Sequence, residues 1–174
     1  MSTYKHYLQF PTSNHNQLAF VSEDDLWLSD ISSLNCRRLT VDFGSIKSPK
    51  FSPCGQYIAF SSDREGSIEA YVIATSGGSA QKITFTGNAC IVVGWKDKDT
   101  IIISSTHDQA FRQGKLYTVS KSGGSLDEIK VGPANAISYG KDLDSAVIQR
   151  HGYGYPNWKR YQGASRYLHD TQKK

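Results

Sequence analysis

Residues Ser48–Thr84 read SPKFSPCGQYIAFSSDREGSIEAYVIATSGGSAQKIT and contain four short apolar segments separated by turn-forming residues. The segments are rich in β-branched and aromatic residues, and Gly, Ser, Pro and Asp bound them, which is typical of short β-strands. A similar pattern precedes this stretch and another follows it, with a period of about 40–46 residues. A four-strand repeat of that length is the sequence signature of a β-propeller blade.

The register of the repeat can be followed through three sets of equivalent segments. They are Leu18–Val21, Ile58–Ser61 and Ile101–Ser104 for the second strands, Asp25–Leu28, Glu69–Val72 and Lys115–Thr118 for the third, and Arg38–Thr40, Lys82–Thr84 and Glu128–Lys130 for the fourth. Ser-Gly-Gly-Ser recurs at 76–79 and 122–125, where glycine permits a tight turn between the last two strands. We therefore expect Trp27, Tyr71 and Tyr117 to occupy equivalent third-strand positions and to share one type of environment.

The repeat predicts an all-β fold, a partial β-propeller of four-stranded antiparallel blades within residues 7–174. Its expected parts are blade one at 7–41, blade two at 46–85, blade three at 89–131 and a partial blade four at 136–174. The fourth repeat shows no convincing third or fourth strand. Because propellers close as rings of about four to eight blades, about 3.5 blades cannot close. We expect a longer protein or a second chain to complete the ring, and the open face to promote homo-oligomers.

Composition limits the classes of protein that the chain can belong to. With 174 residues and 38% hydrophobic residues, the chain suits one domain with a sizeable core. No apolar run approaches the roughly 18 residues of a membrane helix, and the N-terminus does not resemble a signal peptide. Three widely spaced cysteines argue against a disulfide framework and against a zinc site. We expect a cytoplasmic protein with no metal, no cofactor and no membrane partner.

The net charge of +4 comes from the C-terminal segment. Residues 150–174 hold six Lys or Arg against one Asp, and five aromatic residues lie among them. This basic aromatic insertion, at 150–167, interrupts the fourth repeat after its second strand. Such a segment can bind phosphates and stack bases, or it can pack on a neighbouring domain or bind peptides. We favour domain or peptide contact over nucleic acid and assign it to Tyr155, Trp158, Lys159, Arg160, Tyr161 and Arg166.

Three stretches give the chain a family resemblance. They are Asp24–Trp27, Phe51–Gly55 and, most specifically, Gly132–Ala134 together with the Pro-x-Trp-Lys-x-Tyr-x-Gly-x-x-Arg spacing of Pro156–Arg166. Over about residues 7–166 the chain resembles the N-terminal six-bladed, TolB-like propeller of tricorn protease and its bacterial homologues. The resemblance implies a cytoplasmic serine protease, a hydrolase that degrades short peptides, whose propeller filters and channels them to a separate C-terminal catalytic domain. The family's catalytic residues lie far downstream, so none is assigned here.

Other polar clusters are better explained as turns than as catalytic or metal sites. Thr106-His107-Asp108 lacks a positioned nucleophile and an oxyanion hole, and no Gly-x-Ser-x-Gly elbow exists. Asp97–Asp99 and Asp142–Asp144 lack the glycine and distal glutamate of a calcium loop. The residues therefore leave two hypotheses. The first is a non-catalytic propeller that gates peptides for a tricorn-like protease, and the alternative is a stand-alone scaffold that binds a protein partner.

Overall fold

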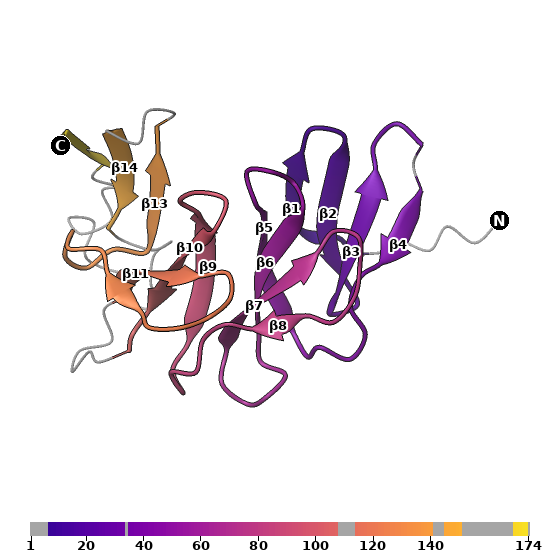
Figure 1. Cartoon of the computed structure of the whole chain (residues 1–174), viewed down its shortest axis with the longest axis horizontal. Coiled ribbons are helices and arrows are strands. Elements are labelled where there is room, and N and C mark those ends of the chain that lie inside the picture. The colour runs from indigo at the N-terminus through magenta and orange to yellow at the C-terminus, as the bar shows by residue number, and fades with distance from the viewer. Residues whose placement is uncertain (1–6, 34, 108–113, 141–144, 151–168, 174) are drawn as a thin grey trace, which may run out of the picture.

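The computed structural model describes residues 7–33, 35–107, 114–140, 145–150 and 169–173 (Figure 1). These residues form strands and connecting turns. The first sheet contains β1 (Gln9–Asn14), β2 (Gln17–Ser22), β3 (Asp25–Asp30) and β4 (Cys36–Arg38). The second contains β5 (Ile46–Phe51), β6 (Tyr57–Ser62), β7 (Glu69–Ala74) and β8 (Gln81–Lys82). The third contains β9 (Cys90–Trp95), β10 (Thr100–Ser105), β11 (Lys115–Ser120) and β12 (Asp127–Glu128). The fourth contains β13 (Ala136–Tyr139), β14 (Ser145–Gln149) and β15 (His169–Lys173).

Each sheet is an antiparallel meander in chain order, which confirms the predicted all-β, partial-propeller fold. Trp27, Tyr71 and Tyr117 are each the third residue of a third strand. They pair with Phe20, Phe60 and Ile103 of the second strands. Their predicted equivalence of position is therefore confirmed. The predicted common environment is not, because Tyr71 and Tyr117 are buried between blades whereas Trp27 is half-buried.

The fourth sheet differs from the sequence-based expectation. It has a third strand, β15, which pairs antiparallel with β14 from Ser145↔Lys173 to Gln149↔His169. The sequence HDTQK of β15 has no apolar residue, so the pattern of alternating apolar residues could not reveal this strand. The basic aromatic insertion thus connects the second and third strands of the blade.

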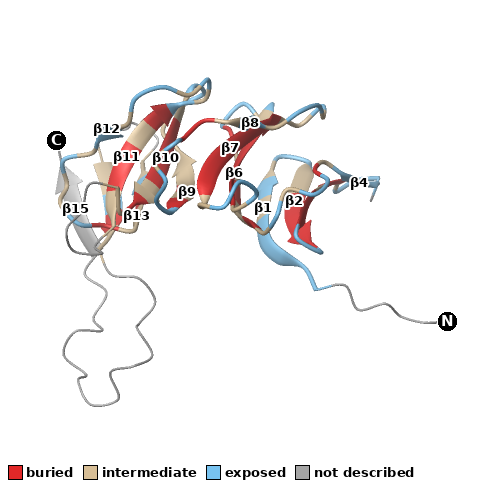
Figure 2. Ribbon diagram, turned by 90° about the horizontal axis from the view of Figure 1, so that it is seen from below, coloured by how far each residue is buried: buried red, intermediate tan, exposed pale blue. Residues whose placement is uncertain are grey.

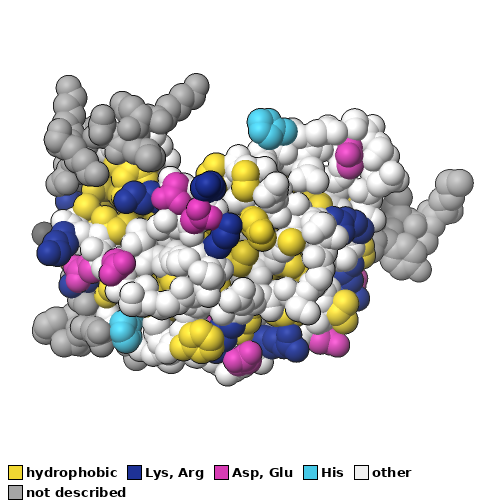
Figure 3. All heavy atoms as spheres, in the orientation of Figure 1, with side chains coloured by type: hydrophobic (Ala, Val, Ile, Leu, Met, Phe, Trp, Pro, Cys, Tyr) yellow, Lys and Arg dark blue, Asp and Glu magenta, His cyan; other side chains and the backbone are white. Residues whose placement is uncertain are grey.

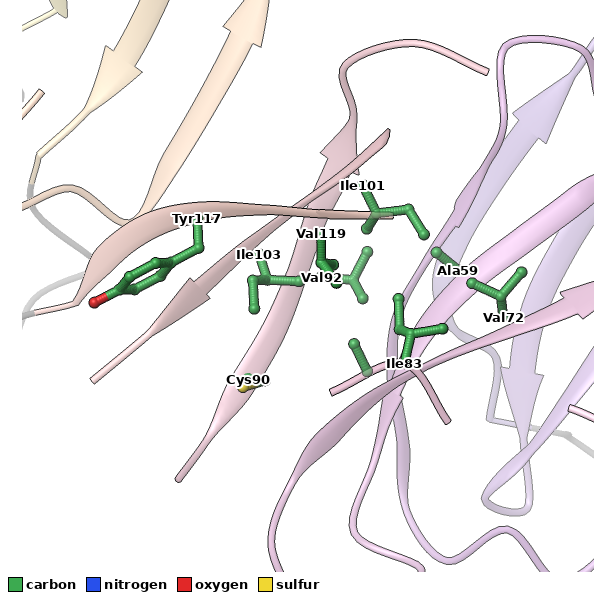
Figure 4. Packing of buried hydrophobic residues seen from close by; sticks show 10 residues of the cluster. Ala59, Val72, Ile83, Cys90, Val92, Ile101, Ile103, Tyr117 and Val119 are labelled. Atoms are coloured by element: carbon green, nitrogen blue, oxygen red, sulfur yellow. The ribbon is translucent and has the colours of Figure 1, made fainter. Parts of the chain in front are cut away.

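The sheets are stacked face to face, and the core lies between them (Figure 2). Between the first and second sheets, small and medium side chains such as Ala19 and Val21 meet the larger Phe60, Tyr71 and Ile73. The second sheet turns its other face, with Ala59, Ala70 and Val72, toward the third. Figure 4 shows this packing around Ile83, Val92, Ile103 and Tyr117. Because side chains alternate along a strand, the second blade presents a bulky face to the preceding blade and a slimmer face to the next.

A polar contact repeats between neighbouring blades. Arg37, on β4, donates from Nη1 to the carbonyl oxygen of Ser76 at 3.2 Å and from Nη2 to that of Thr75. Gln81, on β8, donates from Nε2 to the carbonyl oxygen of Ser122 at 3.2 Å. The two donors occupy the same repeat position, since Arg37 pairs with Leu28 and Gln81 with Val72. The fourth strands of the first and second blades are therefore each connected to the hairpin turn of the next blade.

Within the described residues, no helix is long and apolar enough to cross a membrane.

Candidate functional site: the axial wall

The first strands of successive blades lie side by side. β1 contacts β5, β5 contacts β9, and β9 contacts β13, whereas the remaining strands of each sheet extend outward from them (Figure 1). In a propeller the first strands surround the central axis. We call β1, β5, β9 and β13 the axial wall, because any molecule moving along the axis meets these strands first.

Three of the four strands of the axial wall contain a β-bulge. The register shifts by one extra residue between Gln9 and Thr12 in β1 and between Lys47 and Lys50 in β5. In β9 the shift falls where Ile102 and Ile103 pair with Gly94 and Val92. A bulge bends its strand and disrupts the hydrogen-bonding ladder locally. The irregularity therefore recurs at one level of the wall.

Backbone conformation and proline accompany two of these bulges. Phe10 and Ser48 have φ angles of 48° and 49°, a left-handed conformation that is rare for residues other than glycine. Each is followed by a proline, Pro11 or Pro49, which has no backbone N–H. The repeated residue–proline step thus places the same irregularity in β1 and β5.

Neighbouring blades also engage backbone groups of the wall. The N–H of Val92 in β9 donates to Ser61 Oγ of the second blade at 2.8 Å. The carbonyl oxygen of Lys50 in β5 accepts a hydrogen bond from Nε1 of Trp95, in the third blade, at 2.9 Å. These contacts join the two blades and occupy backbone groups that a bound strand would need.

The axial wall is basic and partly apolar. Its strands carry two lysines, Lys47 and Lys50, and no Asp or Glu, and both lysines are half-buried. Tyr139 of β13 is also half-buried, and burial raises the pKa of its hydroxyl group. Tyr139 therefore remains protonated near neutral pH. Tyr139 packs against the core between the third and fourth blades. The described strands of the wall thus carry two cationic side chains and no carboxylate.

The contact residues predicted in the basic aromatic insertion lie outside the described residues. They are Tyr155, Trp158, Lys159, Arg160, Tyr161 and Arg166. At the first residue of the insertion, Nη1 of Arg150 donates to the carbonyl oxygen of Val131 at 2.7 Å, at the connection between the third and fourth blades. The insertion therefore begins at a residue bonded to the stretch that includes Gly132–Ala134.

The polar clusters assigned to turns can be checked in part. Asp97 Oδ1 accepts hydrogen bonds from the N–H groups of Asp99 and Thr100, both at 2.9 Å. Burial acts to raise the pKa of Asp97, but these hydrogen bonds outweigh it and the pKa is lowered. This is the geometry of an Asx turn. The carbonyl oxygen of His107 accepts a hydrogen bond from Tyr117, while Asp108 and 141–144 lie outside the described residues.

No group of three or more His, Cys, Asp or Glu in the described part of the chain is arranged to hold a metal ion. Sequence reasoning placed the site in the insertion and named no residue of the axial wall. One signal could have indicated the bulges, namely the recurrence of a proline at the same point of the first strands as Pro11 and Pro49. The contacts of Ser61 and Trp95 across blades leave no comparable signal in one sequence.

The stacked four-stranded sheets and the axial wall define a β-propeller, and comparison with known proteins specifies its kind. The model of the tricorn protease N-terminal β-propeller domain matches residues 5–168. The chain therefore belongs to the family of tricorn N-terminal propellers.

Relatives in this family differ in length. The putative tricorn-like protease N-terminal subunit of Sulfurisphaera tokodaii is 31% identical over 170 residues, which are 95% of this chain and 86% of the relative. Tricorn protease homolog 1 of Streptomyces coelicolor is 31% identical over 163 residues, 91% of this chain but 15% of the relative. The crystal structure of the tricorn protease superposes with a TM-score of 0.80 at 27% identity and covers 92% of this chain and 17% of its own. The chain thus spans a small part of the long relatives and most of the subunit.

Proposed function

We propose that the chain is a non-catalytic propeller that guides short peptides to the catalytic part of a tricorn-type serine peptidase. The family assignment is the observation that carries this proposal, because it links the fold to proteins named as proteases. The arrangement of the first strands supports it, since they form a wall along which a peptide can pass. Catalysis is assigned to a different part of the assembly.

Further features of the proposal follow from the same comparison. The catalytic part is either joined to this chain or carried by a second polypeptide, as the name of the Sulfurisphaera relative suggests for that protein. The basic aromatic insertion contacts the peptide or a neighbouring domain through Trp158, Arg160 and Arg166. The protein acts in the cytoplasm and without a cofactor.

A reconstitution experiment tests the proposal. The purified chain is assayed alone, and then together with the polypeptide that supplies the rest of the tricorn-type enzyme, on fluorogenic peptides of three and of ten residues. We expect no hydrolysis by the chain alone. In the assembly, the chain should change the rate for the ten-residue peptide more than the rate for the tripeptide. A chain lacking residues 153–165 should lose this length dependence.

Two results would contradict the proposal. The first is inhibitor-sensitive hydrolysis by the chain alone with one active site per chain, which would assign chemistry to this segment. The second is an assembly whose rates on both peptides are the same with and without the chain. That second result would favour the alternative hypothesis of a scaffold that binds a protein partner.

A further inference from the structure

On the basis of the function proposed above, we propose that the axial wall admits extended peptides without pairing with them as an added β-strand. Exposed strand edges normally bind extended peptides through a run of free backbone N–H and C=O groups. The first strands of this chain are edge strands of their sheets, because each is first in its sheet order. Whether peptides are held along the backbone therefore depends on whether these edges are continuous.

Bulges and prolines interrupt the edges of β1 and β5. Strand addition needs backbone donors and acceptors at regular spacing along the edge. The one-residue shifts in β1 and β5 break that spacing, and Pro11 and Pro49 supply no donor inside the shifted stretches. A peptide aligned with one half of either strand is out of register with the other half.

Side chains close the edge between β5 and β9. Ser61 accepts the hydrogen bond of the buried N–H of Val92, and the indole of Trp95 donates to the carbonyl oxygen of Lys50. Ser61 and Trp95 each cap a backbone group of the neighbouring blade. The packing of the second sheet against the third therefore holds both side chains in place. A strand added here would have to break contacts that hold the second and third blades together.

Recognition by the wall therefore falls to side chains and depends little on the peptide backbone. The ligand class is short peptides of any backbone hydrogen-bonding capacity, including peptides rich in proline. Weak binding of the peptide suits a channel, because a peptide that forms backbone hydrogen bonds along the wall dissociates slowly.

The test uses the full 174-residue chain and two fluorescent hexapeptides of alternating threonine and valine, one unmodified and one N-methylated at every second residue. Both peptides carry a photoreactive group, so that their binding sites can be mapped by mass spectrometry. We expect dissociation constants for the wall that agree within about twofold, or no cross-links to the wall with either peptide. Cross-links confined to β4 or β8 also support the inference, since these strands form the outer edges of their sheets and are not part of the axial wall.

A variant with an opened edge provides the matched comparison. Pro49→Thr combined with Ser61→Ala and Trp95→Phe removes the proline and both caps, whereas Pro53→Thr changes a proline in the β5–β6 turn. Circular dichroism first establishes that both variants fold. The bulges remain in the opened variant, so we expect it to gain binding on one side of the bulge in β5 and in β9, and N-methylation to weaken that binding at least tenfold. The control should resemble the wild type.

Methylation-sensitive binding to β1, β5 or β9 of the wild-type chain would overturn this inference. So would an opened variant that folds and gains no such binding. Either result leaves the proposed guiding function in place, because that function is judged by the peptide-length dependence of the reconstituted enzyme.

Discussion

Tyr71 and Tyr117 occupy the same position in successive third strands, yet their hydroxyl groups have different surroundings. Both side chains are buried. The hydroxyl of Tyr117 donates to the carbonyl oxygen of His107 at 3.0 Å. The hydroxyl of Tyr71 has no hydrogen-bond partner among the described residues, and burial raises its pKa. A buried polar group without a partner costs stability that a paired one does not.

We expect this difference to appear in the free energy of unfolding. Tyr71→Phe should leave stability unchanged or raise it by up to about 1 kcal/mol, because an unpaired hydroxyl is removed. Tyr117→Phe should lower stability by about 1 kcal/mol, because a hydrogen bond is lost. Urea denaturation of the two variants measures both values. Equal losses in the two variants would contradict the contrast.

Two buried threonines hold the start of the third strand in the first two blades. Thr40 Oγ1 accepts a hydrogen bond from the N–H of Leu26 at 2.9 Å and donates to Asp25 Oδ1 at 2.8 Å. Thr84 makes the same pair of contacts with Ala70 and Glu69. Each threonine thus satisfies a buried backbone donor and a buried carboxylate at once.

Thr40→Val and Thr84→Val should each lower the free energy of unfolding by about 2–3 kcal/mol, because valine fits the space but leaves a buried backbone N–H without its acceptor and removes one donor from a buried carboxylate. Thr118→Val is the control, since its hydroxyl makes only an exposed 3.4 Å contact with Asp127. We expect that change to cost less than about 0.5 kcal/mol. A similar cost for all three changes, measured by chemical denaturation, would exclude the threonines as special contributors.

The loop between β3 and β4 is organised around one carboxylate, that of Asp30. The side-chain hydroxyl of Ser32, at 2.6 Å, and the N–H groups of Ser33 and Ser32, at 3.1 and 2.9 Å, donate to Oδ1. Asn16, in the β1–β2 turn, also donates to this oxygen. The hydrogen bonds from Ser32 and Ser33 lower the pKa of Asp30. The carboxylate thus connects two turns of the first blade.

Because the pKa of Asp30 is lower in the folded than in the unfolded chain, its stabilising effect has a definite pH range. The effect is complete above the unfolded pKa of about 3.9 and is lost as the pH falls through the lower folded pKa. We therefore expect the wild-type melting temperature to fall more steeply below about pH 4 than that of Asp30→Asn. Parallel curves for wild type and Asp30→Asn would contradict this role.

Regular elements could be predicted from the sequence, and irregular ones could not. The strands around Phe60 and Tyr71 are buried almost throughout, rich in β-branched and aromatic residues, and repeat in register, so their positions follow from period and composition. β15 is polar throughout and is recognisable only by its pairing with β14. The bulge at Ser48 depends on a local left-handed conformation that the sequence permits but does not require. The hydrogen bond from Trp95 to Lys50 joins residues far apart in the chain, so a local sequence pattern cannot predict it.

For the whole molecule, side-chain alternation locates the uncovered sheet faces. Ile148 packs against the third blade, so its neighbour Val147 points the other way and is 45% exposed. At the opposite end, Leu26 and Leu28 face the second blade and half-buried Trp27 faces away from it. Figure 3 shows apolar side chains scattered among charged ones on one face of the molecule. Uncovered sheet faces of this kind favour association.

We expect the isolated chain to form a dimer or a larger oligomer, with Val147 in the contact. Val147→Asp should shift the sedimentation coefficient toward the monomer value, because a carboxylate is costly to bury. Val41→Asp is the matched control, since Val41 is 60% exposed but lies in the connection between the first two blades. A compact wild-type monomer over the range from micromolar to millimolar concentration would contradict the prediction.

The stacking of a bulky face on a slim one, together with the link from β4 and β8 to the next hairpin, gives the first three blades a direction. The first two junctions repeat the same complementarity, so the first and third blades would present matching faces to each other if the second were removed. Evolution can therefore lengthen or shorten such a protein by whole blades, through duplication or loss of one repeat, while a change of half a repeat would place two unlike surfaces in contact. A duplicated or lost repeat therefore has to keep the contact surfaces between blades as well as the blade itself.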